Sequence, residues 1–134
     1  MNIIVDTCVW SLAFRRKSAK IFNPEKEELV QLIDQGRVVM LGPIRQEILS
    51  GIKEIKQFEK LKLLLSAFPD HPITTSDYET ASSFFNKCRR KGLQGSNTDF
   101  LICAVALNNN FSIFTTDKDF QLFQNIIPFK LHQY

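Results

Sequence analysis

Four acidic side chains are the strongest candidates for chemistry in this sequence. We call them the acidic quartet: Asp6, Glu47, Asp99 and Asp117. Gathered in one cleft they would repel one another, because two unit charges ~4 Å apart interact by about 4 kcal/mol at an effective dielectric constant near 20. A stable cleft of this kind requires a bound cation or raised pKa values. The quartet therefore predicts a metal site, provided that the fold brings its members together.

The chemistry of such a site follows from its ligands, which are all oxygen atoms. Carboxylates favour Mg²⁺ or Mn²⁺, whereas Zn²⁺ favours cysteine and histidine, and the three cysteines of this chain show no Cys-x-x-Cys spacing. A divalent ion can polarise a phosphodiester, lower the pKa of an attacking water and neutralise the leaving oxygen. The sequence thus favours metal-assisted phosphodiester hydrolysis, with all four acids as metal-binding and catalytic candidates.

Each acid also has an ordinary structural interpretation. Asp6 could cap the helix that follows it, and Asp99 lies in the first turn of a predicted helix, where the helix dipole favours a negative charge. Asp117 could shape a turn, and Glu47 could be a solvated helix residue. The functional interpretation therefore depends on the convergence of all four acids rather than on any one of them.

Three short apolar segments are expected to form the strands that position the quartet, at residues 2–5, 37–41 and 112–115. Asp6 directly follows the first strand and Asp117 follows the third. Glu47 lies in the helix after the second strand. Because ligands bind beyond the carboxyl ends of parallel strands, these three acids belong at one edge of the sheet.

Asp99 is positioned by a helix rather than by a strand. It shares a helical face with Ile102 and Cys103, so its carboxylate points with the apolar side of a helix over residues 99–107. A charge on that side is costly unless something pairs with it. We therefore expect Asp99 to face the same cleft as the other acids.

Helices are predicted between the strands. Asn23 and Pro24 begin one helix, Gly42 and Pro43 another, and a capping box at Ser76–Glu79 a third. The full set of predicted helices is 7–14, 24–35, 42–50, 52–67, 76–91, 99–107 and 118–124, with two further short strands at 71–74 and 128–131. Alternating strands and helices indicate a three-layer α/β/α sandwich with a central, mostly parallel sheet, formed by a single domain over residues 1–134.

Charge outside the quartet favours a polyanionic substrate. Apart from the four acids, the chain has 17 basic against 10 acidic residues, a net charge of +7. The basic residues cluster in two places that could bind phosphates, although basic side chains also suit the end of a helix. The clusters are Arg15, Arg16, Lys17 and Lys20, and Lys87, Arg89, Arg90 and Lys91.

The sequence favours a cytoplasmic protein over a secreted or membrane-spanning one. The first residues lack the basic start and long apolar stretch of a secretory signal, and no apolar run approaches the ~20 residues of a membrane span. An odd number of cysteines without metal spacing argues against a disulfide framework and for a reducing cytoplasm. Cys8 and Cys103 lie among apolar residues, which predicts buried thiols.

Four segments in this order resemble the motifs of the PIN-domain family. They span nearly the whole chain, and although each is weak alone, their combination is specific. The segments are residues 3–10 (IIVDTCVW), 43–51 (PIRQEILSG), 97–104 (NTDFLICA) and 114–120 (FTTDKDF).

The resemblance implies a nuclease whose quartet coordinates Mg²⁺ or Mn²⁺. Thr7 is the small hydroxyl residue of the first motif, Thr115 or Thr116 would position water or a ligand carboxylate, and Asp119 would cap the short helix or support the site, with capping favoured. Cys8 stands where the family often has Ser, and Asn97 where some members have another acid, which implies a weaker second metal site. Length and compactness look most like the VapC toxins, which cleave RNA, form homodimers and are blocked by a VapB-type antitoxin. The implied partners are thus a tRNA or rRNA substrate, a VapB-like antitoxin and a second copy of the chain, with no membrane.

Three other functions remain open at this level. A phosphatase could use Asp6 as its nucleophile, but such folds usually carry a second Asp two residues later, where this chain has Cys8, and Lys118 is a weak candidate for their phosphate-binding lysine. A PIN-like module could bind RNA or a partner without cleaving. A receiver domain would need an acidic pair that this sequence lacks.

Overall fold

A four-stranded, wholly parallel sheet forms the centre of the computed structural model, which describes residues 1–14 and 23–134. The strand order is β2-β1-β3-β4. Ile3 pairs with Val38 on one side of β1 and with Ser112 on the other, so β1 is enclosed between neighbours. The strands are β1 (Ile3–Val5), β2 (Val38–Val39), β3 (Ser112–Phe114) and β4 (Lys130–Leu131). The predicted α/β class and parallel sheet are confirmed.

The order of the strands places a crevice between β1 and β3. After β1 the chain crosses to β2, whereas after β3 it crosses in the opposite direction to β4. In parallel α/β sheets such a reversal separates the two connections at the carboxyl ends of the strands, and ligands bind there. Asp6 follows β1 and Thr115 follows β3, so both lie at this reversal point.

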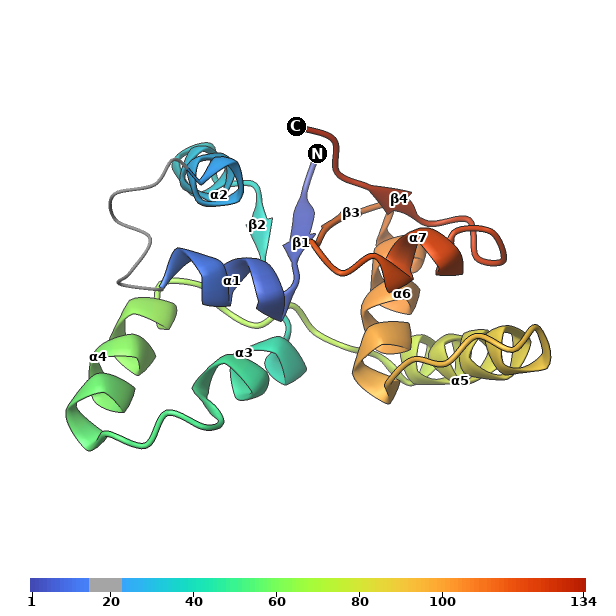
Figure 1. The fold of residues 1–134 in the computed structure, drawn as a ribbon, viewed down its shortest axis with the longest axis horizontal. Coiled ribbons are helices and arrows are strands. Elements are labelled where there is room, and N and C mark those ends of the chain that lie inside the picture. Colours follow the sequence, from blue (N-terminus) through green and yellow to red (C-terminus); the bar gives the residue numbers. More distant parts are fainter. Residues whose placement is uncertain (15–22) are drawn as a thin grey trace.

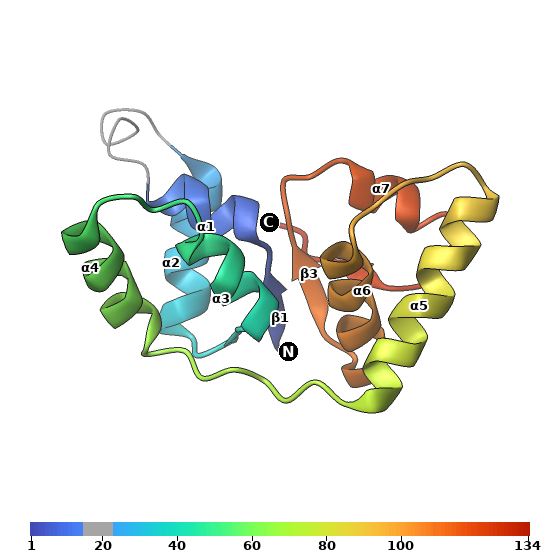
Figure 2. The ribbon, with the colours of Figure 1, turned by 90° about the horizontal axis from the view of Figure 1, so that it is seen from below.

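Seven helices surround the sheet in the described part of the chain. Those before residue 70 gather beside β1 and β2, and those after it gather beside β3 (Figures 1 and 2). They are α1 (Thr7–Ala13), α2 (Pro24–Asp34), α3 (Gly42–Leu49), α4 (Ile55–Leu65), α5 (Thr75–Arg90), α6 (Asn97–Asn109) and α7 (Asp119–Phe123). None of these helices is long and apolar enough to cross a membrane.

Helix α6 is buried on all sides along most of its length. Every residue from 100 to 106 is buried, so α6 lacks the polar face of a surface helix. Phe100 packs against Phe123 of α7, with ring centroids 4.9 Å apart, and against Phe85 of α5 at 5.6 Å. This packing on several sides fixes the position of the helix and therefore of Asp99 in its first turn.

The helix expected to begin at a Ser76–Glu79 capping box starts two residues earlier. Thr74 is the N-cap and its hydroxyl accepts a hydrogen bond from Asp77 N at 3.2 Å, while the Asp77 carboxylate accepts one from Thr74 N at 3.0 Å. Asn108 Nδ2 donates to the other Asp77 oxygen at 2.8 Å. The sequence contains both spacings, and the contact with α6 favours the earlier one.

The strand predicted at 71–74 is not formed. The chain makes a single parallel bridge, between Met40 and Asp70, and then runs without regular structure to Thr74. Pro72 explains the break, because it has no backbone N–H to donate to a strand neighbour.

Helices α2 and α4 bury only part of their apolar side chains. In α2 the buried residues are Leu29 and Leu32, whereas Val30 and Ile33 are 47% and 36% exposed. Helix α4 begins at Ile55 rather than at the predicted residue 52, and Ile55 is 78% exposed. Leu61 and Leu65 are buried, but Leu63 and Leu64 are exposed by 74% and 52%. Helices α2 and α4 therefore carry apolar side chains that the described residues do not cover.

Gly95 provides a test of the packing that holds α6. A Cβ atom at this position would lie 2.7 Å from Phe123 Cζ and 2.9 Å from Phe100 Cε2, and both rings are buried. Gly95→Ala should therefore lower the free energy of unfolding by about 1–3 kcal/mol, measured by urea denaturation. Gly42→Ala is the matched control, because its Cβ would meet only Asp70 Oδ2 at 3.8 Å. Equal stability of the two variants would contradict this packing.

Candidate metal centre

All four members of the acidic quartet line one cavity, as the sequence predicts. The cavity has a volume of about 660 Å³. We call it the acidic cavity, and its lining residues are Asp6, Thr7, Cys8, Gln46, Glu47, Ser50, Asp99 and Asp117. The acids come from the end of β1, the middle of α3, the first turn of α6 and the segment after β3. Four elements that are distant in the sequence thus converge on one site.

Asp6 is the most buried acid of the cavity, at 7% exposure. It is the N-cap of α1, where extended backbone turns into helix, and its Oδ1 accepts a hydrogen bond from Thr7 N at 2.8 Å. Its Oδ2 accepts one from Thr115 Oγ1 at 2.8 Å. The structural interpretation of Asp6 as a cap is therefore correct, and it is compatible with a place in the cavity.

The other three acids also combine a structural bond with a position in the cavity. Glu47 Oε1 accepts from Thr7 Oγ1 at 2.7 Å, which joins α3 to the start of α1. Asp99 Oδ2 accepts from Ser96 N at 3.0 Å in a capping box, and Asp117 Oδ1 accepts from Asp119 N at 2.9 Å. In each case one carboxylate oxygen makes the bond, while the second accepts no hydrogen bond from another described residue.

Thr115 and Cys8 link the two loops that carry Asp6 and Asp117. Thr115 Oγ1 donates to Asp6 and accepts from Asp117 N at 3.0 Å. Cys8 Sγ donates to Asp6 Oδ2 at 3.6 Å and accepts from Thr116 N at 3.4 Å. The expectation of a buried Cys8 thiol is wrong, because Cys8 is half-buried and lines the cavity, whereas Cys103 is fully buried as predicted.

Burial and the charges of neighbouring acids raise the pKa values of two carboxylates in the cavity. Burial raises the pKa of Asp6, the hydrogen bonds from Thr115, Thr7 and Cys8 partly offset this, and the charge of Glu47 adds to the increase. Burial also raises the pKa of Asp99, with further increases from the charges of Asp6 and Asp117. The ion pairs of the described residues use other acids, namely Asp70, Glu59 and Glu28.

The donor set fits a hydrated divalent ion. Every charged ligand in the cavity is a carboxylate, and Mg²⁺ and Mn²⁺ prefer oxygen. The described residues contain no group of three or more His, Cys, Asp or Glu side chains close enough to hold an ion directly. Mg²⁺ usually keeps several waters and is bound through one or two carboxylates, so the spacing is compatible with an ion that is bound partly through water.

Some cavity residues were missed at the sequence level, and others lie elsewhere. Gln46 and Ser50 line the cavity. Ser50 is three residues after Glu47, a spacing that places them on neighbouring parts of a helix surface and could have identified it. Asn97 lines a different cavity, between α5 and α6. Asp119 does not cap α7, because it is the first residue of the helix and Lys118 is the N-cap; its backbone N–H donates to the Asp117 carboxylate.

The predicted phosphate-binding cluster at the end of α5 lies outside the cavity lining. Arg89 and Arg90 are in the last turn of α5 and Lys91 is its C-cap, and all three are exposed. The other cluster, Arg15, Arg16, Lys17 and Lys20, falls outside the described residues.

Solved structures share this fold along their full length. The chain matches VapBC2 of Rickettsia felis bound to a DNA fragment of its promoter with a TM-score of 0.78 at 18% identity, covering 100% of this chain and 99% of that one. It matches VapBC-1 of nontypeable Haemophilus influenzae with a TM-score of 0.74 at 16% identity, covering 99% and 98%. FitAcB of Neisseria gonorrhoeae gives 0.73 at 17% identity, covering 98% and 96%.

Sequence comparison finds relatives of the same length. The chain is 29% identical over 126 residues to VapC ribonuclease Mb1587 of Mycobacterium bovis and to ribonuclease VapC11 of Mycobacterium tuberculosis, covering 92% of this chain and 92% of each relative. The model of the PIN domain family matches residues 3–125, which include every motif and all four acids of the cavity. The chain therefore belongs to the PIN domain family.

Proposed function

We propose that this chain is a Mg²⁺- or Mn²⁺-dependent endoribonuclease and the toxin of a VapBC-type pair. The observation that carries the proposal is the convergence of four carboxylates in one cavity of a PIN-domain fold, with no basic side chain among the described residues that line it. Relatives that match 92% of the chain bear the name ribonuclease, which favours RNA over other phosphodiesters.

Four acids of the cavity would hold the ion, and two threonines hold two of those acids in place. Asp6, Glu47, Asp99 and Asp117 would hold the ion, partly through bound water, and the bound ion would polarise the scissile phosphate and lower the pKa of water. Thr115 holds the Asp6 carboxylate through the bond to Oδ2, and Thr7 holds Glu47. Asp6, buried beneath the others, is thereby fixed in orientation before any ion binds.

An antitoxin and a second copy of the chain are the proposed protein partners. The structures with this fold include a toxin–antitoxin complex from Klebsiella pneumoniae, which the chain matches with a TM-score of 0.62 at 17% identity. The exposed apolar side chains on α2 and α4 support a protein partner, because surfaces of this kind are favourable to bury. These residues are Val30, Ile33, Ile55, Leu63 and Leu64.

The direct test of the function compares two acids near the cavity. Asp99→Asn should lower cleavage of tRNA and rRNA by more than roughly 100-fold, because loss of an ion ligand should cost more than loss of a residue that only supports a ligand. Asn keeps an oxygen for the Ser96 bond, and removal of a repelling charge should leave the metal-free stability unchanged or increased. Asp119→Asn is the control, because Asp119 is exposed and outside the cavity.

The same assay separates the competing functions. Cleavage by the unmodified chain should require Mg²⁺ or Mn²⁺ and disappear in EDTA. Turnover of a generic phosphate ester without RNA cleavage would favour a phosphatase instead. RNA binding without cleavage would favour a binding module, and an unfolded Asp99→Asn variant would remove that residue from the metal centre.

Thr115 should control how well the cavity binds its ion. Thr115→Val keeps the shape of the side chain but removes the bonds to Asp6 and Asp117, so the affinity for Mn²⁺ should fall by roughly 10- to 100-fold, measured by titration calorimetry. Thr116→Val is the matched control, since Thr116 donates its hydrogen bond to Cys8 Sγ through the backbone N–H. Equal affinities of the two variants would show that the Thr115 hydroxyl does not support the ion.

The free energy of unfolding should depend on both metal and pH, because the ion and protons bind the same carboxylates. In the metal-free chain the raised pKa values of Asp6 and Asp99 mean that the folded state binds these protons more tightly than the unfolded state. Their contribution to the free energy of unfolding therefore falls as pH rises from about 3.8 through the raised values, and it stays low at neutral pH.

A divalent ion should replace those protons. At 100 times its dissociation constant, Mn²⁺ should add about 2.7 kcal/mol at neutral pH and less at mildly acidic pH, read from the thermal midpoint. Asp6→Asn should lose this increment, whereas Asp119→Asn should keep it. An increment that is the same at both pH values would disprove binding at the buried acids.

A further inference from the structure

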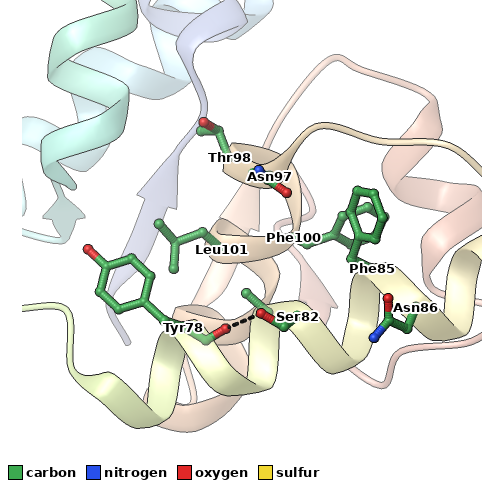
Figure 3. A pocket seen from close by; sticks show the side chains of 9 residues that line it. Tyr78, Ser82, Phe85, Asn86, Asn97, Thr98, Phe100 and Leu101 are labelled. Carbon is green, nitrogen blue, oxygen red and sulfur yellow. Dashed lines mark hydrogen bonds between the residues drawn. The ribbon is translucent and has the colours of Figure 1, made fainter.

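A second cavity lies between α5 and α6. Its volume is about 470 Å³, and we call it the α5–α6 groove. Figure 3 shows its lining from close by. The lining residues are Tyr78, Ala81, Ser82, Phe85, Asn86, Asn97, Thr98, Phe100 and Leu101.

The lining combines aromatic surface with side-chain amides. Tyr78 is 53% exposed and Phe85 is half-buried, so both present ring surface to the groove. Figure 3 marks one hydrogen bond among the lining residues, from Ser82 Oγ to Tyr78 O, so the amides of Asn86 and Asn97 are not bonded within the groove. Each amide offers two donors and an acceptor without carrying charge.

The groove and the acidic cavity share the first turn of α6. Asn97 and Thr98 line the groove, and Asp99, the next residue, lines the acidic cavity. Figure 3 shows Asn97 and Thr98 where α6 begins, above Leu101. A chain molecule held at the acidic cavity would therefore need to pass only one helical turn to enter the groove.

Positive charge borders the groove at the end of α5. The Arg89 guanidinium lies 5.6 Å from the centre of the Phe85 ring, and Lys87 and Arg90 are in the same last turn. None of the described residues that line the groove carries a charged side chain. Neutral amides and aromatic rings, with cations at one end, suit a nucleobase with its phosphate outside, because bases stack on aromatic side chains and hydrogen-bond along their edges.

We propose that the α5–α6 groove binds one unpaired nucleobase of the RNA, next to the phosphodiester held at the acidic cavity. This proposal rests on the proposed ribonuclease function and adds a determinant of which bond is cut. Tyr78 supplies stacking surface, and Asn97 contacts the edge of the base. The groove would thus discriminate among bases at a nucleotide flanking the cleavage position.

Binding measured without metal tests the groove independently of cleavage. The probe is a fluorescently labelled single-stranded RNA of random sequence, titrated in EDTA and followed by fluorescence polarisation. Tyr78→Ala should weaken binding by roughly 5- to 100-fold, as expected for loss of one stacked base. Tyr134→Ala is the matched control, because Tyr134 is also exposed, at 59%, but packs against Phe114 and bonds to Glu25.

Cleavage products supply the second readout. Asn97→Ala should change the distribution of bases beside the cut in a random RNA library more than it changes the total rate. If Tyr78→Ala and Asn97→Ala bind and cut like the unmodified nuclease, the groove proposal is overturned and the nuclease stands. If the unmodified chain binds RNA through Tyr78 but never cuts it, the ribonuclease fails and the groove survives. If Tyr78→Ala instead converts a dimer to a monomer with unchanged RNA affinity, the groove is an interface between copies and the proposal is overturned.

Discussion

The free-energy cost of gathering several carboxylates, one of them buried, in one cavity is the constraint on which the rest of this structure depends. Burial raises the pKa values of Asp6 and Asp99, and the charges of neighbouring acids add to the increase. Such an arrangement opposes folding, so it persists only where surrounding elements hold each acid in place. The parallel sheet, the buried helix α6 and the bonds among the loops provide that support.

The same carboxylates stabilise the fold and line the acidic cavity. Asp6 caps α1, Asp99 completes a capping box and Asp117 fixes the turn before α7. In each case the carboxylate accepts a hydrogen bond from a backbone N–H. This bond stabilises the charged form and offsets part of the free-energy cost of burial. Structural and functional interpretations of these acids, which look like alternatives in the sequence, are therefore compatible in the molecule.

Helix α6 organises two cavities at once. Because it is buried along residues 100–106, its position is set by α5, α7 and the sheet rather than by solvent. Its first turn projects Asp99 into the acidic cavity and Asn97 and Thr98 into the α5–α6 groove. One rigid helix would thus keep the metal centre and a neighbouring site for a base in fixed positions relative to each other.

Sequence alone determined the four strands of the sheet, their parallel order and the convergence of the quartet, because buried strands and their following acids are local patterns joined by a general rule for parallel sheets. It also predicted a strand at 71–74 that the structure does not form. It did not decide between the overlapping capping boxes at Thr74 and Ser76, which depends on Asn108 in another helix. It also missed the place of Cys8 in the cavity and of Asn97 in the groove. Those outcomes depend on which elements pack together, and only the tertiary structure brings residues from separate parts of the chain within a few ångströms of one another.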